Sequence, residues 1–153
     1  MATYVVKGIE MERADVSSIL GGRKAFQGGI ASRMELINLS NKGVSKEVLL
    51  RLAKYLNISL GQMAEMLPLT ERTIQRYQRG QRFNKAVSEQ ILQIAEVSAR
   101  GSEVFGGRKK FLAWVNSPSR AFGNRTPFSL LSSRFGNEAI SDELGRIEHG
   151  VLS

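Results

Sequence analysis

The side chains with the clearest chemical potential are basic ones gathered in one short stretch of the chain. Between residues 70 and 85 the acidic residue is Glu71 alone, and the basic residues are Arg72, Arg76, Arg79, Arg82 and Lys85. The whole chain of 153 residues has a formal charge of +8, so this stretch, at +4, holds half of it. Such a cluster indicates a polyanion partner, most often nucleic acid, although a solvated helix face accounts equally well for charge taken alone.

The elements around the cluster favour nucleic acid. Residues 60–67 and 71–79 predict two short helices joined by a turn, which is the spacing of a helix-turn-helix. Met63 and the small Ala64 are expected to face the second helix, and Thr70 is expected to cap it.

The second helix is expected to bury Ile74 and Tyr77. At about 100° per residue, its opposite face carries the arginines, bordered by Gln75. Arginine binds phosphate or guanine through two hydrogen bonds and glutamine can read adenine, whereas a merely solvated helix pair would require neither. The sequence therefore predicts a DNA-binding surface that consists of Thr70, Arg72, Thr73, Gln75, Arg76, Arg79 and Arg82.

Apolar periodicity predicts helices in most of the remaining chain. One helix begins after Ser45, and a long one runs from about Lys85 to Val104. Residues 2–6 lean towards β structure but are too few to found a sheet. We expect an all-α fold with an N-terminal helical extension in residues 1–44, a helix-turn-helix domain in residues 45–105 and a small helical domain in residues 106–153.

The C-terminal domain is expected to hold three helices. The first spans about Lys109–Val115. Thr126-Pro127 would open the second, because Thr can cap a helix and Pro fits its first turn, and Phe135-Gly136 would end it. Asn137 would cap the third, whose apolar stripe consists of Ile140, Leu144 and Ile147.

Residues suited to catalysis or metal binding are scarce. The chain has no cysteine and a single histidine, His149, and the carboxylates Glu138, Asp142 and Glu143 have no second catalytic group beside them. Asp142 and Arg146 are spaced to form only a surface pair. We therefore expect no enzyme activity, no metal and no cofactor.

No segment indicates a membrane protein. No apolar run approaches the roughly 18 residues of a membrane span, and the first residues lack the pattern of a signal peptide. We expect a cytoplasmic protein.

The C-terminal end has two interpretations. Its apolar stripe could pack on the protein's own core and leave a loose tail, which the pattern alone favours. Alternatively, the helix and the apolar tail at residues 151–153 could fill a cleft in a partner, with polar contacts from Arg146, Glu148 and His149. Arg125, in the loop before these helices, could likewise hydrogen-bond only its own loop.

Two parts of the sequence resemble a known family. Residues 45–100 are similar to the Xre-type helix-turn-helix, and the C-terminal half resembles the toxin-binding domain of the antitoxin class called Xre–MbcA–ParS. Pro68, Asn124 and Leu152 depart from the residues common in that class. The matching motifs are Gly123-Asn124-Arg125-Thr126-Pro127 with Leu130-Leu131, and Leu144-Gly145-Arg146-Ile147-Glu148-His149-Gly150-Val151.

The resemblance implies an antitoxin of a type II toxin–antitoxin system, paired with a RES-domain or related toxin that consumes NAD. It implies that the C-terminal domain binds and inhibits the toxin, and that the helix-turn-helix binds operator DNA and represses the operon. It also implies a toxin-binding surface that consists of Arg125, Thr126, Pro127, Arg146, Glu148, His149, Gly150, Val151, Leu152 and Ser153.

Two other functions remain open on the sequence. A stand-alone transcription regulator would use the C-terminal half for dimerisation or effector sensing, and a pure protein-interaction module would keep the helix-turn-helix without binding DNA. Because operators for such domains are usually read by symmetric dimers, we expect a homodimer, with residues 1–45 as one candidate contact, and a hetero-oligomer with the toxin.

Overall fold

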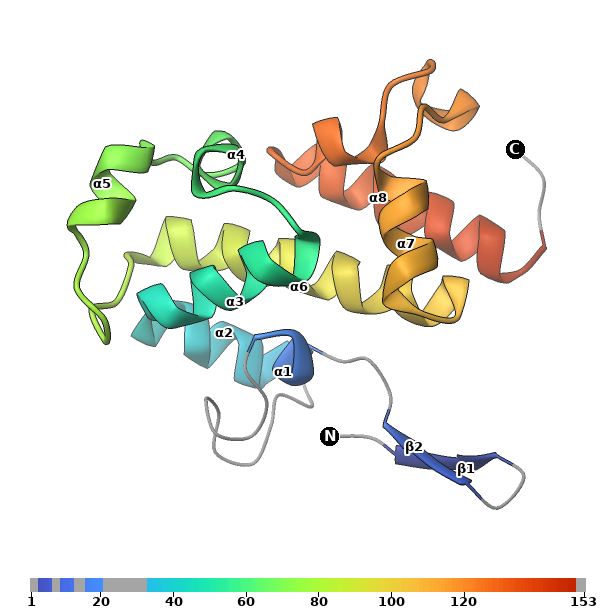
Figure 1. Ribbon diagram of the computed structural model, residues 1–153, viewed down its shortest axis with the longest axis horizontal. Helices are drawn as coiled ribbons and strands as arrows, with labels where there is room; N and C mark the ends of the chain where they lie inside the picture. The colour runs from blue at the N-terminus through green and yellow to red at the C-terminus, as the bar shows by residue number, and fades with distance from the viewer. Residues whose placement is uncertain (1–2, 7–8, 13–15, 21–32, 151–153) are drawn as a thin grey trace.

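A long central helix, α6 (Lys85–Phe105), organises the fold (Figure 1). The computed structural model describes residues 3–6, 9–12, 16–20 and 33–150. The predicted extent of α6 is confirmed. It begins where the side chain of Asn84 accepts a hydrogen bond from the backbone N–H of Val87 at 3.0 Å, and it ends at Gly106, whose φ of 77° is left-handed.

The other elements are short. In chain order they are β1 (Thr3–Val6), β2 (Ile9–Glu12), α1 (Val16–Ile19), α2 (Arg33–Lys42), α3 (Lys46–Leu56), α4 (Leu60–Glu65), α5 (Glu71–Arg76), α7 (Arg108–Val115), the 3₁₀ helices η2 (Arg120–Phe122) and η3 (Pro127–Leu130), and α8 (Arg134–Glu148).

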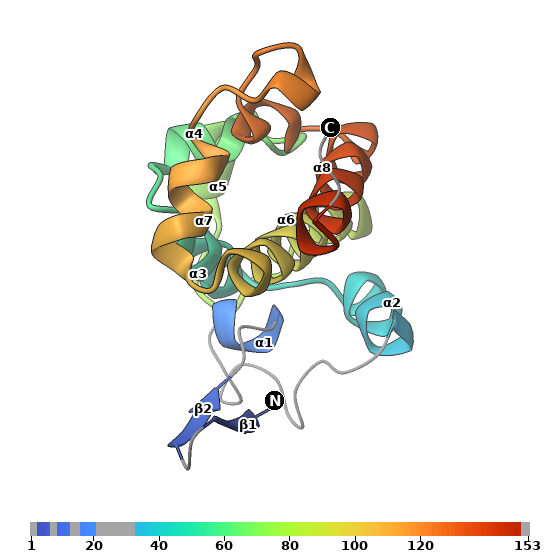
Figure 2. The same ribbon diagram turned by 90° about the vertical axis from the view of Figure 1, so that its right-hand side faces the viewer.

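The helices are divided between two sides of α6. In Figure 2, α3, α4, α5 and α7 lie on one side of it, and α2 and α8 lie on the other. The helices α2, α3, α7 and α8 all pack directly against α6. The helix-turn-helix and the C-terminal helices are therefore built on one shared support.

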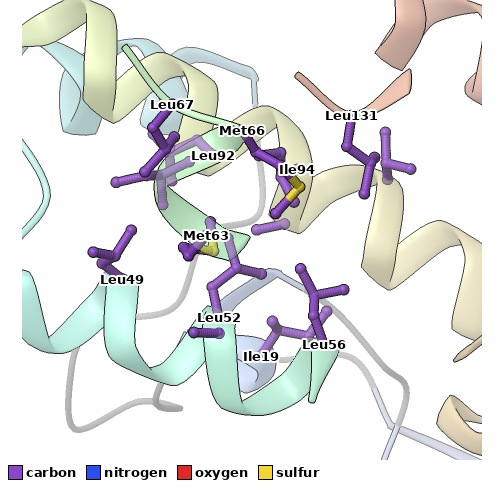
Figure 3. Packing of buried hydrophobic residues seen from close by; sticks show 14 of the residues in the cluster. Ile19, Leu49, Leu52, Leu56, Met63, Met66, Leu67, Leu92, Ile94 and Leu131 are labelled. Atoms are coloured by element: carbon purple, nitrogen blue, oxygen red, sulfur yellow. The ribbon is translucent and has the colours of Figure 1, made fainter. Parts of the chain in front are cut away.

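The hydrophobic core runs through both halves of the chain. Leu131, which follows η3, is fully buried and belongs to the same cluster as Met66 and Ile94 (Figure 3). The side-chain amide of Gln90 joins the halves as well, because its nitrogen donates to the carbonyl oxygens of Leu131 at 2.7 Å and Met66 at 3.3 Å. The division of the chain after residue 105 stays a prediction.

The predicted all-α class is confirmed for the two helical domains. Near the N-terminus the structure adds a two-stranded antiparallel hairpin, in which Thr3 lies opposite Glu12 and Val6 opposite Ile9. The expectation that residues 2–6 are too few to found a sheet is wrong, because Ile9–Glu12 supplies a second strand. Its charge alternates with apolar residues over only four positions, which is too short a pattern to predict a strand.

The start of α8 differs from the prediction, which ended one helix at Phe135-Gly136 and capped the next with Asn137. In the structure these residues lie inside α8, and Ser133 is the cap, since its hydroxyl accepts a hydrogen bond from the N–H of Gly136 at 3.0 Å. Gly136 serves close packing here: a Cβ on it would lie 1.8 Å from the carbonyl oxygen of Leu130. The glycine permits contact between elements and does not end a helix.

Within the described part of the chain, no helix combines the length and apolar character needed to cross a bilayer.

Candidate functional site

The helix-turn-helix consists of α4 and α5. Ser59 opens α4 with a capping box, in which its hydroxyl accepts from the N–H of Gln62 at 3.1 Å and the Gln62 side chain accepts from the N–H of Ser59 at 3.0 Å. Met63 and Ala64 are buried, as expected for residues that face the core and the second helix. The helix ends at Glu65, two residues earlier than predicted, so the connection to α5 is longer than the expected turn.

Thr70 fixes the start of α5. Its hydroxyl accepts a hydrogen bond from the N–H of Thr73 at 3.1 Å and lies 2.9 Å from the Thr73 hydroxyl. Ile74, which is fully buried, anchors the middle of the helix. Thr70 and Thr73, both predicted to bind DNA, thus form the N-terminal cap of α5 in this structure.

The end of α5 corrects the prediction for Arg79. The helix ends at Arg76 rather than Arg79, because Tyr77 is extended, with ψ of 135°, and its ring stacks on Phe83 with centroids 4.6 Å apart. Arg79 is exposed but lies in the following turn. The helical-wheel argument therefore holds for Arg72 and Arg76 and does not apply to Arg79.

The exposed arginines of α5 and of the turn that follows it are unpaired. Arg72, Arg76 and Arg79 are exposed, and none forms an ion pair with a residue that the structure describes. The Gln75 side chain lies at the limit of hydrogen bonding to Glu71, at 3.5 Å. Arg82 stands apart, because its guanidinium donates to the carbonyl oxygen of Gly43 at 2.6 Å and so helps to hold the fold.

Sequence reasoning missed two residues of α3 that position this surface. The Lys46 ammonium donates to the carbonyl oxygens of Tyr77 at 2.6 Å and Gln75 at 3.3 Å, which lie at the negative end of α5. The Glu47 carboxylate accepts from the N–H of Gly80 at 2.6 Å. Both contacts join residues about thirty positions apart, so no local pattern could reveal them.

The loop before η3 holds the first predicted toxin-binding residues. Gly123 and Asn124 are both left-handed, with φ of 63° and 65°, and Ser119 pairs with Arg125 across the turn. The Arg125 side chain is exposed and makes a long hydrogen bond of 3.4 Å to the carbonyl oxygen of Phe122, in its own loop. This contact uses only the Nε of the guanidinium.

Thr126 and Pro127 have structural roles at the start of η3. The Thr126 hydroxyl accepts from the N–H of Ser129 at 3.3 Å, and Pro127 occupies the first position of η3 and is buried. The predicted helix start is confirmed, although the helix is a 3₁₀ turn that ends at Leu130. Pro127 is not on the described surface.

The apolar stripe of α8 packs on the protein's own core. Ile140 and Leu144 are fully buried, and Ile147 is half-buried. The stripe is thus not available to a partner, and any contact by α8 must come from its exposed residues.

The exposed residues at the end of α8 are mostly paired. Arg146 pairs with the buried Glu143 at 2.7 Å rather than with Asp142, which corrects the expected surface pair. Glu148 lies 3.4 Å from Arg100, and His149 is exposed beyond the last turn. Gly150 is exposed and left-handed, with φ of 71°, and the predicted contacts Val151, Leu152 and Ser153 lie outside the described residues.

No group of three or more His, Asp or Glu side chains suited to a metal ion occurs among the described residues. The arrangement offers two surfaces that can bind macromolecules: an unpaired basic one at α5, and a mixed polar one formed by the η3 loop and the end of α8.

Two family models match separate parts of the chain. Residues 35–96 match the antitoxin Xre-like helix-turn-helix domain, and residues 100–150 match the antitoxin Xre/MbcA/ParS C-terminal toxin-binding domain. The boundary between the two matches falls inside α6, the helix that supports both halves.

Curated relatives carry the name Antitoxin Xre. A protein of Yersinia enterocolitica is 38% identical over 73 residues, which cover 47% of this chain and 49% of that protein, so the chain spans about half the length of this relative in the match. A protein of Photorhabdus laumondii is 26% identical over 74% of this chain and 78% of its own length.

A solved structure has the same fold. A chain of the M. tuberculosis MbcT–MbcA toxin–antitoxin complex superposes with a TM-score of 0.51 at 18% identity, covering 71% of this chain and 96% of its own. The two matched domains lie in the same order as the helix-turn-helix and C-terminal helices described above. The chain therefore carries an Xre-like helix-turn-helix domain followed by an Xre/MbcA/ParS C-terminal domain, the two domain types of this antitoxin family.

Proposed function

We propose that the chain is the antitoxin of a type II toxin–antitoxin system and the repressor of its own operon. In this proposal the C-terminal domain binds and inhibits a cognate toxin, and the helix-turn-helix binds operator DNA as part of a homodimer in the cytoplasm. The chain acts by binding and carries no catalysis of its own. The resemblance of its C-terminal motifs to this antitoxin class supports a RES-like, NAD-consuming toxin as the partner.

One observation carries the proposal: a helix-turn-helix with unpaired outward arginines and a domain matching a toxin-binding family occur in one chain. The arginines Arg72 and Arg76 present charge suited to phosphate or guanine. The end of α8 offers exposed polar groups and leads into the tail, as a segment that enters a cleft requires.

The test uses co-expression with the product of the neighbouring reading frame. Deletion of residues 146–153 is expected to abolish neutralisation and co-purification of the toxin and to leave binding of the promoter intact. Arg134→Ala/Glu138→Ala, which removes an exposed ion pair from the other end of α8, is the matched control and is expected to retain both activities.

The outcomes separate the competing functions. Promoter binding by a chain that captures no neighbouring product would indicate a stand-alone regulator. Capture of the product without promoter binding would indicate a pure protein-interaction module. Loss of both activities in a deletion variant that still gives the helical circular dichroism of the full chain would contradict separate surfaces.

A further inference from the structure

The charges of the described helices are divided unevenly between the two sides of the molecule. We define the basic face as the side of the molecule formed by α3, α4, α5, residues 77–84 and α7. These segments contain ten basic and three acidic residues, a net charge of +7. The helices α2, α6 and α8 contain six basic and eight acidic residues, a net charge of −2.

Ion pairing follows the same division. Every ion pair between residues that the structure describes joins side chains of α2, α6, α8 or His149. The pairs between arginine or lysine and a carboxylate are Arg33–Glu96, Lys85–Glu89, Arg100–Glu148, Arg134–Glu138 and Arg146–Glu143. None of the ten cations of the basic face has a carboxylate partner in the described part of the chain. The basic face therefore holds charge that no carboxylate of the described residues neutralises, while Lys46, Arg82 and Arg108 donate to backbone carbonyl oxygens.

The basic face extends beyond the helix-turn-helix. The first turn of α7 consists of Arg108, Lys109 and Lys110, all exposed, with no acidic residue. Cations at this end of a helix oppose its dipole and cost free energy. The family match assigns these residues to the C-terminal domain, but in Figure 2 α7 lies on the same side of α6 as α5.

Arg108 attaches this turn to the helix-turn-helix domain. Its guanidinium donates to the carbonyl oxygens of Tyr55 at 2.7 Å and Lys54 at 3.2 Å, at the end of α3, and lies 5.4 Å from the centre of the Tyr55 ring. Lys109 and Lys110 follow Arg108 in the same turn, which this contact joins to the end of α3, where Lys54 is exposed. At its other end α3 reaches α5 through Lys46. The basic face is thus continuous from α5 along α3 to α7.

The length of this face fits duplex DNA. The 21 residues of α6 separate α5 from α7 and measure about 31 Å at about 1.5 Å per residue, close to the roughly 34 Å of one turn of B-DNA. We propose that Lys109 and Lys110 bind phosphates of the same duplex that α5 enters, about one turn away, so that the C-terminal domain contributes to DNA binding. This inference rests on the proposed DNA binding by α5.

A DNA backbone fits the face better than an acidic protein does. The lysines are a compact row of charge without an apolar residue exposed beside them in the first turn of α7, as phosphate binding requires. The residues assigned to the toxin lie on the η3 loop and α8, and α8 is on the opposite side of α6.

The test measures the affinity of the full chain for duplexes as a function of KCl concentration. The probes are a 30-bp duplex from upstream of the chain's own gene, an unrelated 30-bp duplex, and duplexes shortened towards 12 bp. Lys109→Ala/Lys110→Ala is expected to lower the slope of log affinity against log salt by about 1.8, because each lost phosphate contact removes about 0.9. The affinity should fall by roughly tenfold or more at about 0.1 M salt on both long duplexes.

Arg33→Ala/Arg134→Ala is the matched control. It removes two cations that are 77% and 76% exposed, from α2 and α8, and should leave the slope unchanged. The loss caused by the lysine variant should vanish on the shortest duplexes, whereas the loss caused by Arg76→Ala should persist on every length. Thermal melting confirms that each variant folds.

Each other result overturns the inference in a recognisable way. An unchanged slope in the lysine variant, with a slope lowered by Arg76→Ala, would show that DNA does not reach α7. An equal loss in the control would show a general effect of net charge. A loss of toxin co-purification with an unchanged slope would assign the lysines to the toxin. Absence of DNA binding by the unaltered chain would refute the proposed function itself.

Discussion

The helices α5 and α8 both carry exposed arginines, but these arginines have opposite surroundings. Arg72 and Arg76 on α5 reach solvent without a carboxylate partner among the described residues. Arg134 and Arg146 on α8 each pair with a carboxylate of the same helix, at 3.1 Å and 2.7 Å. The difference indicates that α5 can recognise a polyanion through charge, whereas α8 must recognise a partner through shape and individual contacts.

The two helices are also held in place differently. The six residues of α5 are fixed at their ends, by Thr70 at the start and by Lys46 at the finish, with Ile74 buried between them. The fifteen residues of α8 are fixed along their length by Ile140 and Leu144. A short helix held at its ends leaves nearly its whole outer surface for a ligand.

The largest effect is expected from the closest packing of α8. In Gly136→Ala the new Cβ would lie 1.8 Å from the Leu130 carbonyl oxygen, which is backbone and cannot rotate away. We expect a loss of about 3 kcal/mol in the free energy of unfolding, measured by urea denaturation. Toxin co-purification should fall with it.

Gly145→Ala is the matched control for that variant. Gly145 lies in the same helix, and the nearest atom to its added Cβ is a terminal nitrogen of Arg100 at 3.5 Å. Since alanine favours helix over glycine by up to about 1 kcal/mol, this variant should be neutral or more stable. Equal destabilisation by both substitutions would mean that Gly136 is not at a close contact.

The second prediction concerns the contact that ends α5. Lys46→Met removes charged hydrogen bonds to two carbonyl oxygens and is expected to destabilise the fold by about 1.5 kcal/mol. DNA affinity should fall because α5 is less well placed, but the salt slope should stay constant because the Lys46 ammonium is already bound to the protein. Arg76→Ala should instead lower the slope by about one unit. A lowered salt slope in Lys46→Met would show that Lys46 contacts a phosphate, and would contradict its role in positioning α5.

The comparison also shows what the sequence could and could not predict. Periodicity predicts the outward direction of Arg72 and Arg76 and the full extent of α6, because residues three and four positions apart lie on the same face of a helix. Arg79 was placed wrongly because the helix ends where Tyr77 stacks on Phe83, a contact that no local pattern encodes. Local glycine statistics likewise misplaced the start of α8, because Gly136 is required by a neighbour in space.

The residues predicted to bind a toxin were likewise placed correctly only in part. The motif around Thr126 and Pro127 correctly predicted a helix start. Pro127 is nevertheless buried at that start, so it does not lie on the surface that was predicted for it. The exposure of Arg146, Glu148 and His149 followed from the stripe of α8. The pairing of Arg146 with Glu143 rather than Asp142 did not, because residues three and four positions apart on a helix are both within reach, and sequence spacing does not choose between them.

The third prediction compares equivalent caps on the two helices. Thr70→Ala and Ser133→Ala each remove a side-chain acceptor for the first turn, and each is expected to cost about 1 kcal/mol. Because α5 has only six residues, fraying of its first turn should also weaken DNA binding, whereas Ser133→Ala should leave DNA binding unchanged. Equal DNA affinities of the two variants in a promoter-shift titration would contradict the view that α5 depends on its ends.

The smallest effect on stability is expected at the end of α8. Glu148 and Arg100 are 43% and 45% exposed and 3.4 Å apart, so Glu148→Ala should change the free energy of unfolding by less than about 0.5 kcal/mol. A double-mutant cycle with Arg100→Ala measures the pair directly. Because the fold gains so little from Glu148, any large loss of toxin affinity in Glu148→Ala must arise from a contact with the toxin. A coupling energy above about 1 kcal/mol would instead mean that Glu148 serves to stabilise the position of α8. The residue expected to contact the toxin would then be Arg125, which pairs with no carboxylate among the described residues.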